Sequence, residues 1–177
     1  MAKNTAEMSD YEFGIAMEKV LKPILEEALE DTLTKTADRW DSKDFMGEKW
    51  IAELKCRRAT DKMGRPVSSK TFSNWFMSDT KIEMAKREAK VKGDLARDVV
   101  FFYYFERDQT LWSIVWNEEE FSQFKVDWTP LKNAEGKVVR HQKNYSIPYT
   151  SWDLLRDFAA ERKAAAEAAP AKNEIIG

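Results

Sequence analysis

Residues 44–55 read DFMGEKWIAELK, and no other stretch indicates the fold so clearly. From Lys49 to Arg57 apolar and polar residues alternate, as expected of a strand with two different faces. Gly47 lies where a turn would join this strand to a preceding one. The segment 40–58 is therefore predicted to form a β-hairpin.

The register of that hairpin decides which side chains meet. Glu53 and Lys55 are two residues apart, so their side chains lie on the same side of the strand. With a two-residue turn, Asp44 falls one diagonal step from Glu53 on that side. A slip of one residue would reverse the choice and favour Asp41. We take Asp44 as the partner of Glu53 and keep Asp41 in reserve.

Helical segments flank the hairpin. Apolar residues at helical spacing predict a first helix over about 15–29, with a kink or a restart at Pro23. A second helix is predicted over 78–92, capped by Ser or Asp at its start and stopped by Gly at its end. The intervening residues 58–71 are rich in Gly, Pro, Ser and basic residues and are expected to form a mobile loop.

The C-terminal half reads as strands with short helices. Apolar runs predict strands over 99–105 and 111–116, a short helix over 117–124 and a further strand over 137–147. Together with the first half, this is an α/β or α+β pattern around one sheet.

The chain is predicted to contain one domain. Ser151 is expected to cap a last helix that closes a domain over residues 1–160. Residues 161–177 are rich in Ala, Glu and Lys and are expected to form a frayed tail.

Composition restricts the class of protein. Of 177 residues, 43% are hydrophobic and 12% are aromatic, which is typical of a globular core. The middle, residues 45–97, is basic and its flanks are acidic, a pattern typical of a polyanion-binding face. A single cysteine, Cys56, and a single histidine, His141, exclude an internal disulfide and a Cys- or His-rich metal centre. No signal-like or membrane-spanning stretch is present, so we expect a cytoplasmic protein without membrane contacts.

Asp44, Glu53 and Lys55 would supply what hydrolysis of a phosphodiester requires. Magnesium takes oxygen ligands, and one or two carboxylates with waters and the phosphate are enough to bind it. A bound cation polarises the phosphoryl oxygen and lowers the pKa of an attacking water. A nearby lysine can position that water or stabilise developing charge. Two clustered carboxylates would otherwise repel each other.

Asp44 followed by Glu53-Leu54-Lys55 resembles the PD-(D/E)xK nuclease superfamily, which includes restriction endonucleases, junction resolvases and many phage nucleases. The order helix, hairpin, helix, strand over about 15–116 is also similar to the core of that superfamily. The resemblance implies a restriction-endonuclease-like central mixed sheet flanked by helices. It also implies that Asp44 and Glu53 bind Mg²⁺, with Mn²⁺ able to substitute, and that Lys55 orients or activates the water. The motif departs in one respect, because a lysine and not a proline precedes Asp44.

The same resemblance implies further site residues. Residues 72–81 are similar to a stretch of phage-type members in which a lysine at the start of the second helix approaches the site, so Lys81 is a fourth catalytic candidate. A phage-encoded protein acting in its host cell fits this similarity. A glutamate of the first helix often completes such sites, and Glu27 is preferred as the third metal ligand. The other candidates are Glu18, Glu26 and Glu30.

Basic residues after the hairpin could track a phosphate backbone or form an ordinary exposed loop. They are Arg57, Arg58, Lys62, Arg65 and Lys70.

The leading hypothesis is a magnesium-dependent nuclease that hydrolyses phosphodiester bonds of DNA, as a monomer or a homodimer. One alternative is a non-catalytic nucleic-acid-binding module on the same scaffold. Another is a protein-interaction factor that uses its acidic flanks. Tryptophans could stack on bases, but Trp50, Trp112 and Trp116 lie in core-like strands and are expected to pack inside the protein.

Overall fold

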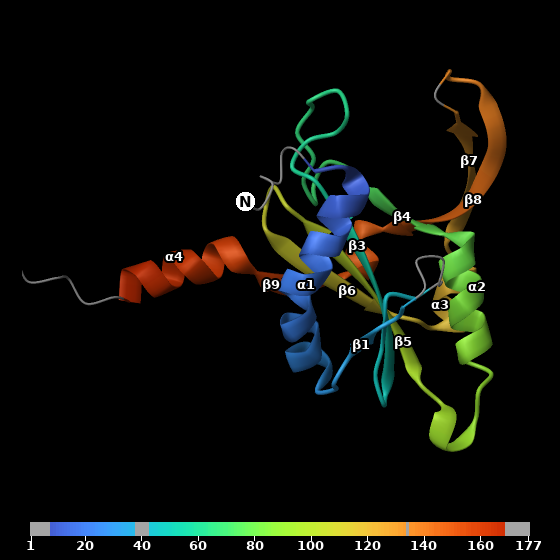
Figure 1. Ribbon diagram of the computed structural model, residues 1–177, viewed down its shortest axis with the longest axis horizontal. Helices are drawn as coiled ribbons and strands as arrows, with labels where there is room; N and C mark the ends of the chain where they lie inside the picture. The colour runs from blue at the N-terminus through green and yellow to red at the C-terminus, as the bar shows by residue number, and fades with distance from the viewer. Residues whose placement is uncertain (1–7, 38–42, 134, 169–177) are drawn as a thin grey trace, which may run out of the picture.

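A computed structural model describes residues 8–37, 43–133 and 135–168 (Figure 1). Its centre is a six-stranded mixed sheet, in which the third and fourth strands are parallel and the other neighbours are antiparallel. The predicted mixed class with a central mixed sheet is therefore confirmed. In spatial order the strands are β1 (Thr34–Lys35), β2 (Phe45–Met46), β3 (Trp50–Arg57), β5 (Asp98–Phe105), β6 (Thr110–Val115) and β9 (Asp153–Asp157).

A second sheet, which was not predicted, lies beside the first. It is antiparallel and its order is β4 (Asn74–Ser78), β8 (Val138–Pro148) and β7 (Lys125–Lys132). The helices are α1 (Asp10–Leu29), α2 (Asp79–Glu88), α3 (Glu118–Ser122) and α4 (Phe158–Ala168), with 3-10 turns η2 (Gly93–Leu95) and η3 (Tyr149–Ser151). No helix of the described residues is long and apolar enough to cross a membrane.

α1 begins at a capping box that precedes the predicted start. The Ser9 hydroxyl accepts the Glu12 N–H at 3.2 Å, and the Glu12 carboxylate accepts the Ser9 N–H at 2.8 Å. These bonds satisfy N–H groups that have no partner inside the helix. The helix therefore starts at Asp10 and continues without interruption through Pro23.

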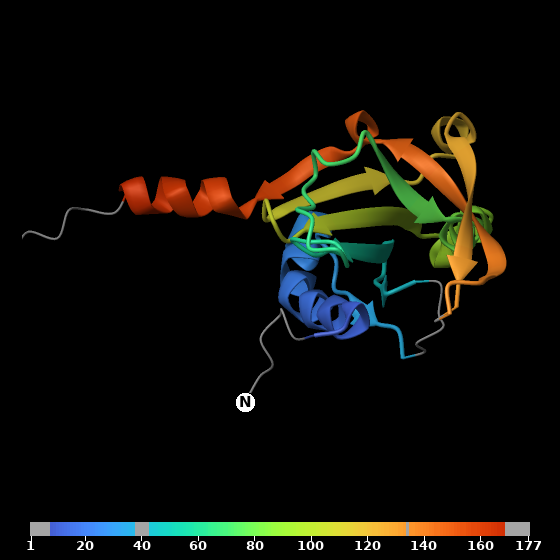
Figure 2. The same ribbon diagram turned by 90° about the horizontal axis from the view of Figure 1, so that it is seen from above.

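The central sheet separates two apolar cores. One face of β3 packs Ala52 and Leu54 against Leu21 of α1, and the other packs Ile51 against Ile82 of α2. Figure 2 shows α1 on one side of the sheet and α2 with the smaller sheet on the other. The polar residues that alternate along β3 therefore face a second layer of protein. The alternating sequence pattern alone would fit a face covered by water equally well.

The C-terminal region differs from the prediction. Ser151 ends η3 and does not cap a helix. The next residues form β9, which pairs with β6 and completes an edge of the sheet. α4 starts only at Phe158 and extends away from the rest of the fold (Figures 1 and 2). Residues 161–168, predicted to fray, are helical, while 169–177 lie outside the described residues.

Candidate functional site

The β2–β3 turn determines which side chains face each other. Met46 pairs with Ile51 and Phe45 with Ala52, and continuing this register beyond the end of β2 puts Asp44 opposite Glu53. Four residues, 47–50, lie between the paired Met46 and Ile51, where a two-residue turn at 47–48 was predicted. The observed register differs from the predicted register by two residues. Because two is an even number, Asp44 still lies on the same face of the sheet as Glu53, as predicted.

The side chain of Asp31, just beyond α1, holds this turn. Its carboxylate accepts the backbone N–H groups of residues 48–50 at 2.8 to 3.1 Å. Gly47 fits beside it because a Cβ there would lie 2.2 Å from the Asp31 Oδ2. Burial raises the pKa of Asp31, but the donated N–H groups outweigh it and hold the pKa below its usual value. The helix end therefore sets the register that brings Asp44 to Glu53.

Glu53 is the buried acid at the centre of the site, with 7% of its surface exposed. Its Oε1 forms an ion pair with the Nζ of Lys81 at 2.6 Å. Lys81 is the third residue of α2, as expected of a lysine in the first turn of that helix. The other oxygen, Oε2, is buried and has no hydrogen-bond partner among the described residues. A buried polar atom of this kind is costly unless a ligand or an ion satisfies it.

Asp44 is close enough to Glu53 for its negative charge to act on the Glu53 carboxyl. Its Oδ2 accepts the backbone N–H of Leu54 at 2.9 Å, which orients the side chain. Burial first, and the negative charge of Asp44 second, raise the pKa of Glu53 well above its ordinary value, although Lys81 opposes both. When Glu53 carries a proton, Asp44 can accept a hydrogen bond from it. One ammonium, that of Lys81, pairs with Glu53, so the two acids and this lysine together are negative when both acids are ionised.

The side chain of Lys55 lies on the same face of β3 as Glu53 but extends toward β4. Its Nζ donates to the carbonyl oxygen of Phe76 in β4 at 3.3 Å and lies 5.8 Å from the centroid of the Tyr103 ring. The lysine in contact with Glu53 is therefore Lys81. The catalytic roles of both lysines stay predictions.

Glu27 lies away from this cluster. Its side chain is 74% exposed and approaches Arg156 of β9 at 3.5 Å, at the opposite edge of the sheet from β2. Over residues 8–37, 43–133 and 135–168, no group of three or more Asp, Glu, His or Cys is arranged to hold a metal ion. The structure therefore does not support Glu27 as a metal ligand, and the reserve candidate Asp41 lies outside the described residues.

Glu18 is another candidate among the glutamates of α1. It forms an ion pair with Lys35 of β1. Burial, and then the charges of Glu18 and Asp44, raise the pKa of the Cys56 thiol. Cys56 packs against the core on the α1 side of the sheet, and among the described residues no hydrogen bond or ion pair joins Glu18 to Asp44 or Glu53.

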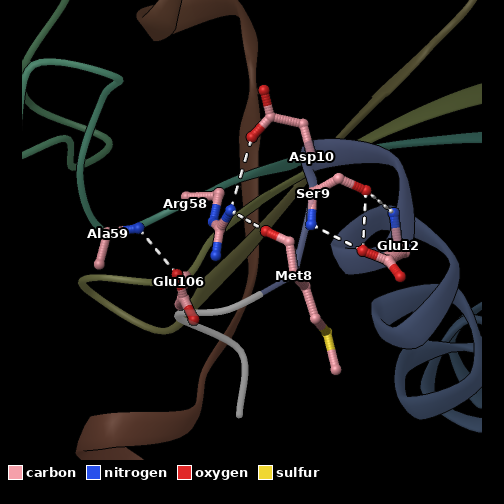
Figure 3. Close-up of polar contacts among 7 residues, drawn as sticks. All are labelled: Met8, Ser9, Asp10, Glu12, Arg58, Ala59 and Glu106. Atoms are coloured by element: carbon pink, nitrogen blue, oxygen red, sulfur yellow. Dashed lines mark hydrogen bonds and ion pairs between the residues drawn. The ribbon is translucent and has the colours of Figure 1, made fainter. Parts of the chain in front are cut away.

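Arg58 fastens the start of α1 to the end of β3. Its guanidinium donates to the carbonyl oxygen of Met8 at 2.6 Å and lies 3.7 Å from the carboxylate of Asp10 (Figure 3). The next residue, Ala59, donates its N–H to the Glu106 carboxylate at 2.8 Å (Figure 3). These contacts favour a structural role for Arg58 over the predicted phosphate contact.

The remaining predicted phosphate-binding residues differ in their surroundings. Arg65 pairs with Asp61 at 2.6 Å inside the loop, and Arg57 donates its Nε–H to the Tyr103 hydroxyl at 3.1 Å. The loop, expected to be mobile, is hydrogen-bonded through Asp61, which also accepts two of its backbone N–H groups. Lys62 and Lys70 are exposed.

Comparison with protein-family profiles finds no match, and comparison with curated proteins finds no significant similarity.

Proposed function

We propose that this protein is a metal-dependent deoxyribonuclease in which Asp44 and Glu53 bind Mg²⁺, or Mn²⁺ in its place. The observation that carries the proposal is the pair of adjacent carboxyls, one of them buried with an oxygen that has no partner among the described residues. Such a pair is unfavourable by itself because each negative charge opposes ionisation of the other. A binding module or an interaction surface has no need of it, since clustered carboxylates repel phosphate.

The donor set fits a hard divalent cation. Magnesium is commonly held by one or two carboxylates, with waters and substrate phosphate completing its shell. When bound, it supplies polarisation of the phosphoryl oxygen and a lowered pKa for water. Glu53 must lose its proton before it can act as a ligand. Asp44 is already oriented by the N–H of Leu54.

The two lysines would serve the phosphate and the water. Lys81 holds Glu53 in place, and it lies in a first helical turn whose N-cap, Ser78, provides no side-chain hydrogen bond. The free N–H groups of that turn favour an anion. We assign the orientation of the attacking water to Lys55, which shares the face of Glu53 and is held by a long hydrogen bond to a carbonyl oxygen and by the Tyr103 ring.

The order of elements supports a restriction-endonuclease-like fold. α1, the β2–β3 hairpin, α2 and β5 follow one another as in the core of the PD-(D/E)xK superfamily, with the acids on the hairpin. β5 runs parallel to β3, as a connection through a helix allows. We therefore propose membership of that superfamily.

The test is degradation of plasmid and single-stranded DNA with Mg²⁺ or Mn²⁺. We expect cleavage that EDTA abolishes and that Glu53→Gln reduces by at least about 100-fold, because a metal ligand is lost. Glu27→Gln is the matched control, since it removes a predicted acid that lies outside the site, and it should leave cleavage unchanged. Absence of cleavage by the wild-type protein under all these conditions would overturn the proposal.

A further inference from the structure

A pocket of about 310 Å³ lies beside the candidate active site. Arg57 lines it and lies two residues after Lys55 on the same face of β3. Phe76 lines it as well, and its carbonyl oxygen accepts the hydrogen bond that the Lys55 ammonium donates. Lys55 therefore lies between the pocket and the two carboxylates.

The walls of this pocket are aromatic. Trp75 and Phe76 come from β4, Tyr103 and Phe105 come from β5, and Phe72 precedes β4. Phe72 is 51% exposed and Phe76 is 37% exposed. The fold leaves these two large rings at the surface, where water would otherwise cover them.

Basic, polar and acidic groups surround these walls, and both acids are paired, Asp10 with Arg58 and Asp61 with Arg65. The Arg57 guanidinium lies 5.8 Å from the Tyr103 ring centroid, and Lys62 is exposed at the pocket. Asn74, which also lines the pocket, carries an amide that can both donate and accept hydrogen bonds. Aromatic faces, an amide and cations together suit a flat ring with polar edges that is joined to a phosphate.

We propose that the pocket receives an unstacked nucleobase of the strand whose phosphate is cleaved. The inference rests on the proposed function and names its substrate class: DNA with at least one unpaired nucleotide, as in a single strand, a frayed end or a mismatch. Stacking on an aromatic side chain is favourable for any base and needs no sequence readout. A paired base must first leave the duplex, which costs a few kcal/mol and is easiest where pairing is already lost. Cations beside the pocket would contact the phosphates next to that nucleobase.

The experiment compares cleavage of one labelled sequence as a single strand, as a duplex with one mismatch and as a fully paired duplex. We expect kcat/KM to be about tenfold or more higher for the single strand than for the paired duplex. Phe72→Ala should lower kcat/KM on the single strand by about 5- to 150-fold, the loss expected for one base stack. Tyr149→Ala is the matched control, because Tyr149 is 49% exposed and does not line the pocket.

Binding separates failure of this inference from failure of the nuclease assignment. With Glu53→Gln protein, anisotropy of a labelled single strand should report weaker binding when Phe72→Ala or Phe76→Ala is added. Each variant is accepted for this comparison only if its Tm matches that of its parent, and the second variant serves if the first fails this criterion. Cleavage that is equal on single and paired strands and insensitive to both variants overturns the pocket proposal and leaves the nuclease intact. Pocket-dependent binding without any wild-type cleavage overturns the nuclease instead.

Discussion

The Oε1 of Glu53 lies 2.6 Å from the Nζ of Lys81, and this ion pair joins the β2–β3 hairpin to the start of α2. A second pair, Lys43 with Glu88 at 3.4 Å, links the residue before Asp44 to the end of the same helix. Both contacts cross between layers of the fold. The helix therefore positions the hairpin acids as well as covering the apolar face of the sheet.

The buried pair predicts strong coupling between its partners. Lys81→Met leaves Glu53 buried without its cation, so we expect the free energy of unfolding at pH 8 to fall by about 3–5 kcal/mol. The double variant Lys81→Met with Glu53→Gln should recover most of that loss, because no uncompensated charge remains. Urea titrations of the two single variants and the double variant give the coupling. Additive losses would contradict the pairing.

The raised pKa of Glu53 predicts how stability depends on pH without metal. The folded protein holds the proton of Glu53 more tightly than the unfolded chain, whose ordinary value is 4.5. The stabilising effect of this proton is complete below that value and is lost as the pH rises toward the folded pKa. Glu53→Gln removes the titration, so the variant should gain on the wild type as the pH rises from 4.5.

Urea unfolding in EDTA at successive pH values checks this expectation. The difference in unfolding free energy between wild type and Glu53→Gln must change with pH in the stated direction. A constant difference from pH 4 to pH 8 would mean that Glu53 titrates normally and is not held against Asp44.

The Asp31 turn predicts an effect of Gly47→Ala. The added Cβ would displace the Asp31 carboxylate from N–H groups of residues 48–50. We expect a loss of about 1–3 kcal/mol in the free energy of unfolding, with a larger loss of cleavage because Asp44 shifts relative to Glu53. Gly14→Ala is the control, since its Cβ meets nothing within 4 Å in α1 and should be neutral or stabilising. Equal Tm values for the two variants would disprove the role of the turn.

Arg58 and Lys62 predict opposite outcomes. Arg58→Gln should lower Tm because it removes the contacts to Met8 and Asp10. Lys62→Gln should keep Tm and lower the salt dependence of DNA binding by about one phosphate contact. Thermal melts and binding titrations across a series of salt concentrations distinguish them. A Tm loss only for Lys62→Gln would reverse the assignment.

Local pattern predicted the hairpin well because strand alternation has a period of two. An error of two residues in the register of Asp44 left it on the correct face, whereas an error of one would not have done so. A helix start at Ser78 or Asp79 likewise placed Lys81 in the first turn of α2. Helical spacing could not choose between Glu18 and Glu27, because it identifies the face of a helix but not the sheet edge that each residue reaches.

Other features depend on partners distant in sequence. Asp31 carries no periodic signal, and its role appears only when the end of α1 meets the turn at 48–50. Three edge strands of mixed composition are of this kind: β4, β7 and β9. Whether such segments form strands depends on the neighbouring strands with which they pair. Ser151 looked like a helix cap because serine is favoured there, but the next residues pair with β6 instead.

The most direct measurement is an anomalous difference map from a crystal soaked in Mn²⁺. If Asp44 and Glu53 bind the metal, the map shows one strong peak in contact with carboxylate oxygens of both residues, and no peak at that position in crystals of Glu53→Gln. Manganese bound elsewhere on the protein, with none between these two side chains at saturating concentration, would contradict the proposed binding.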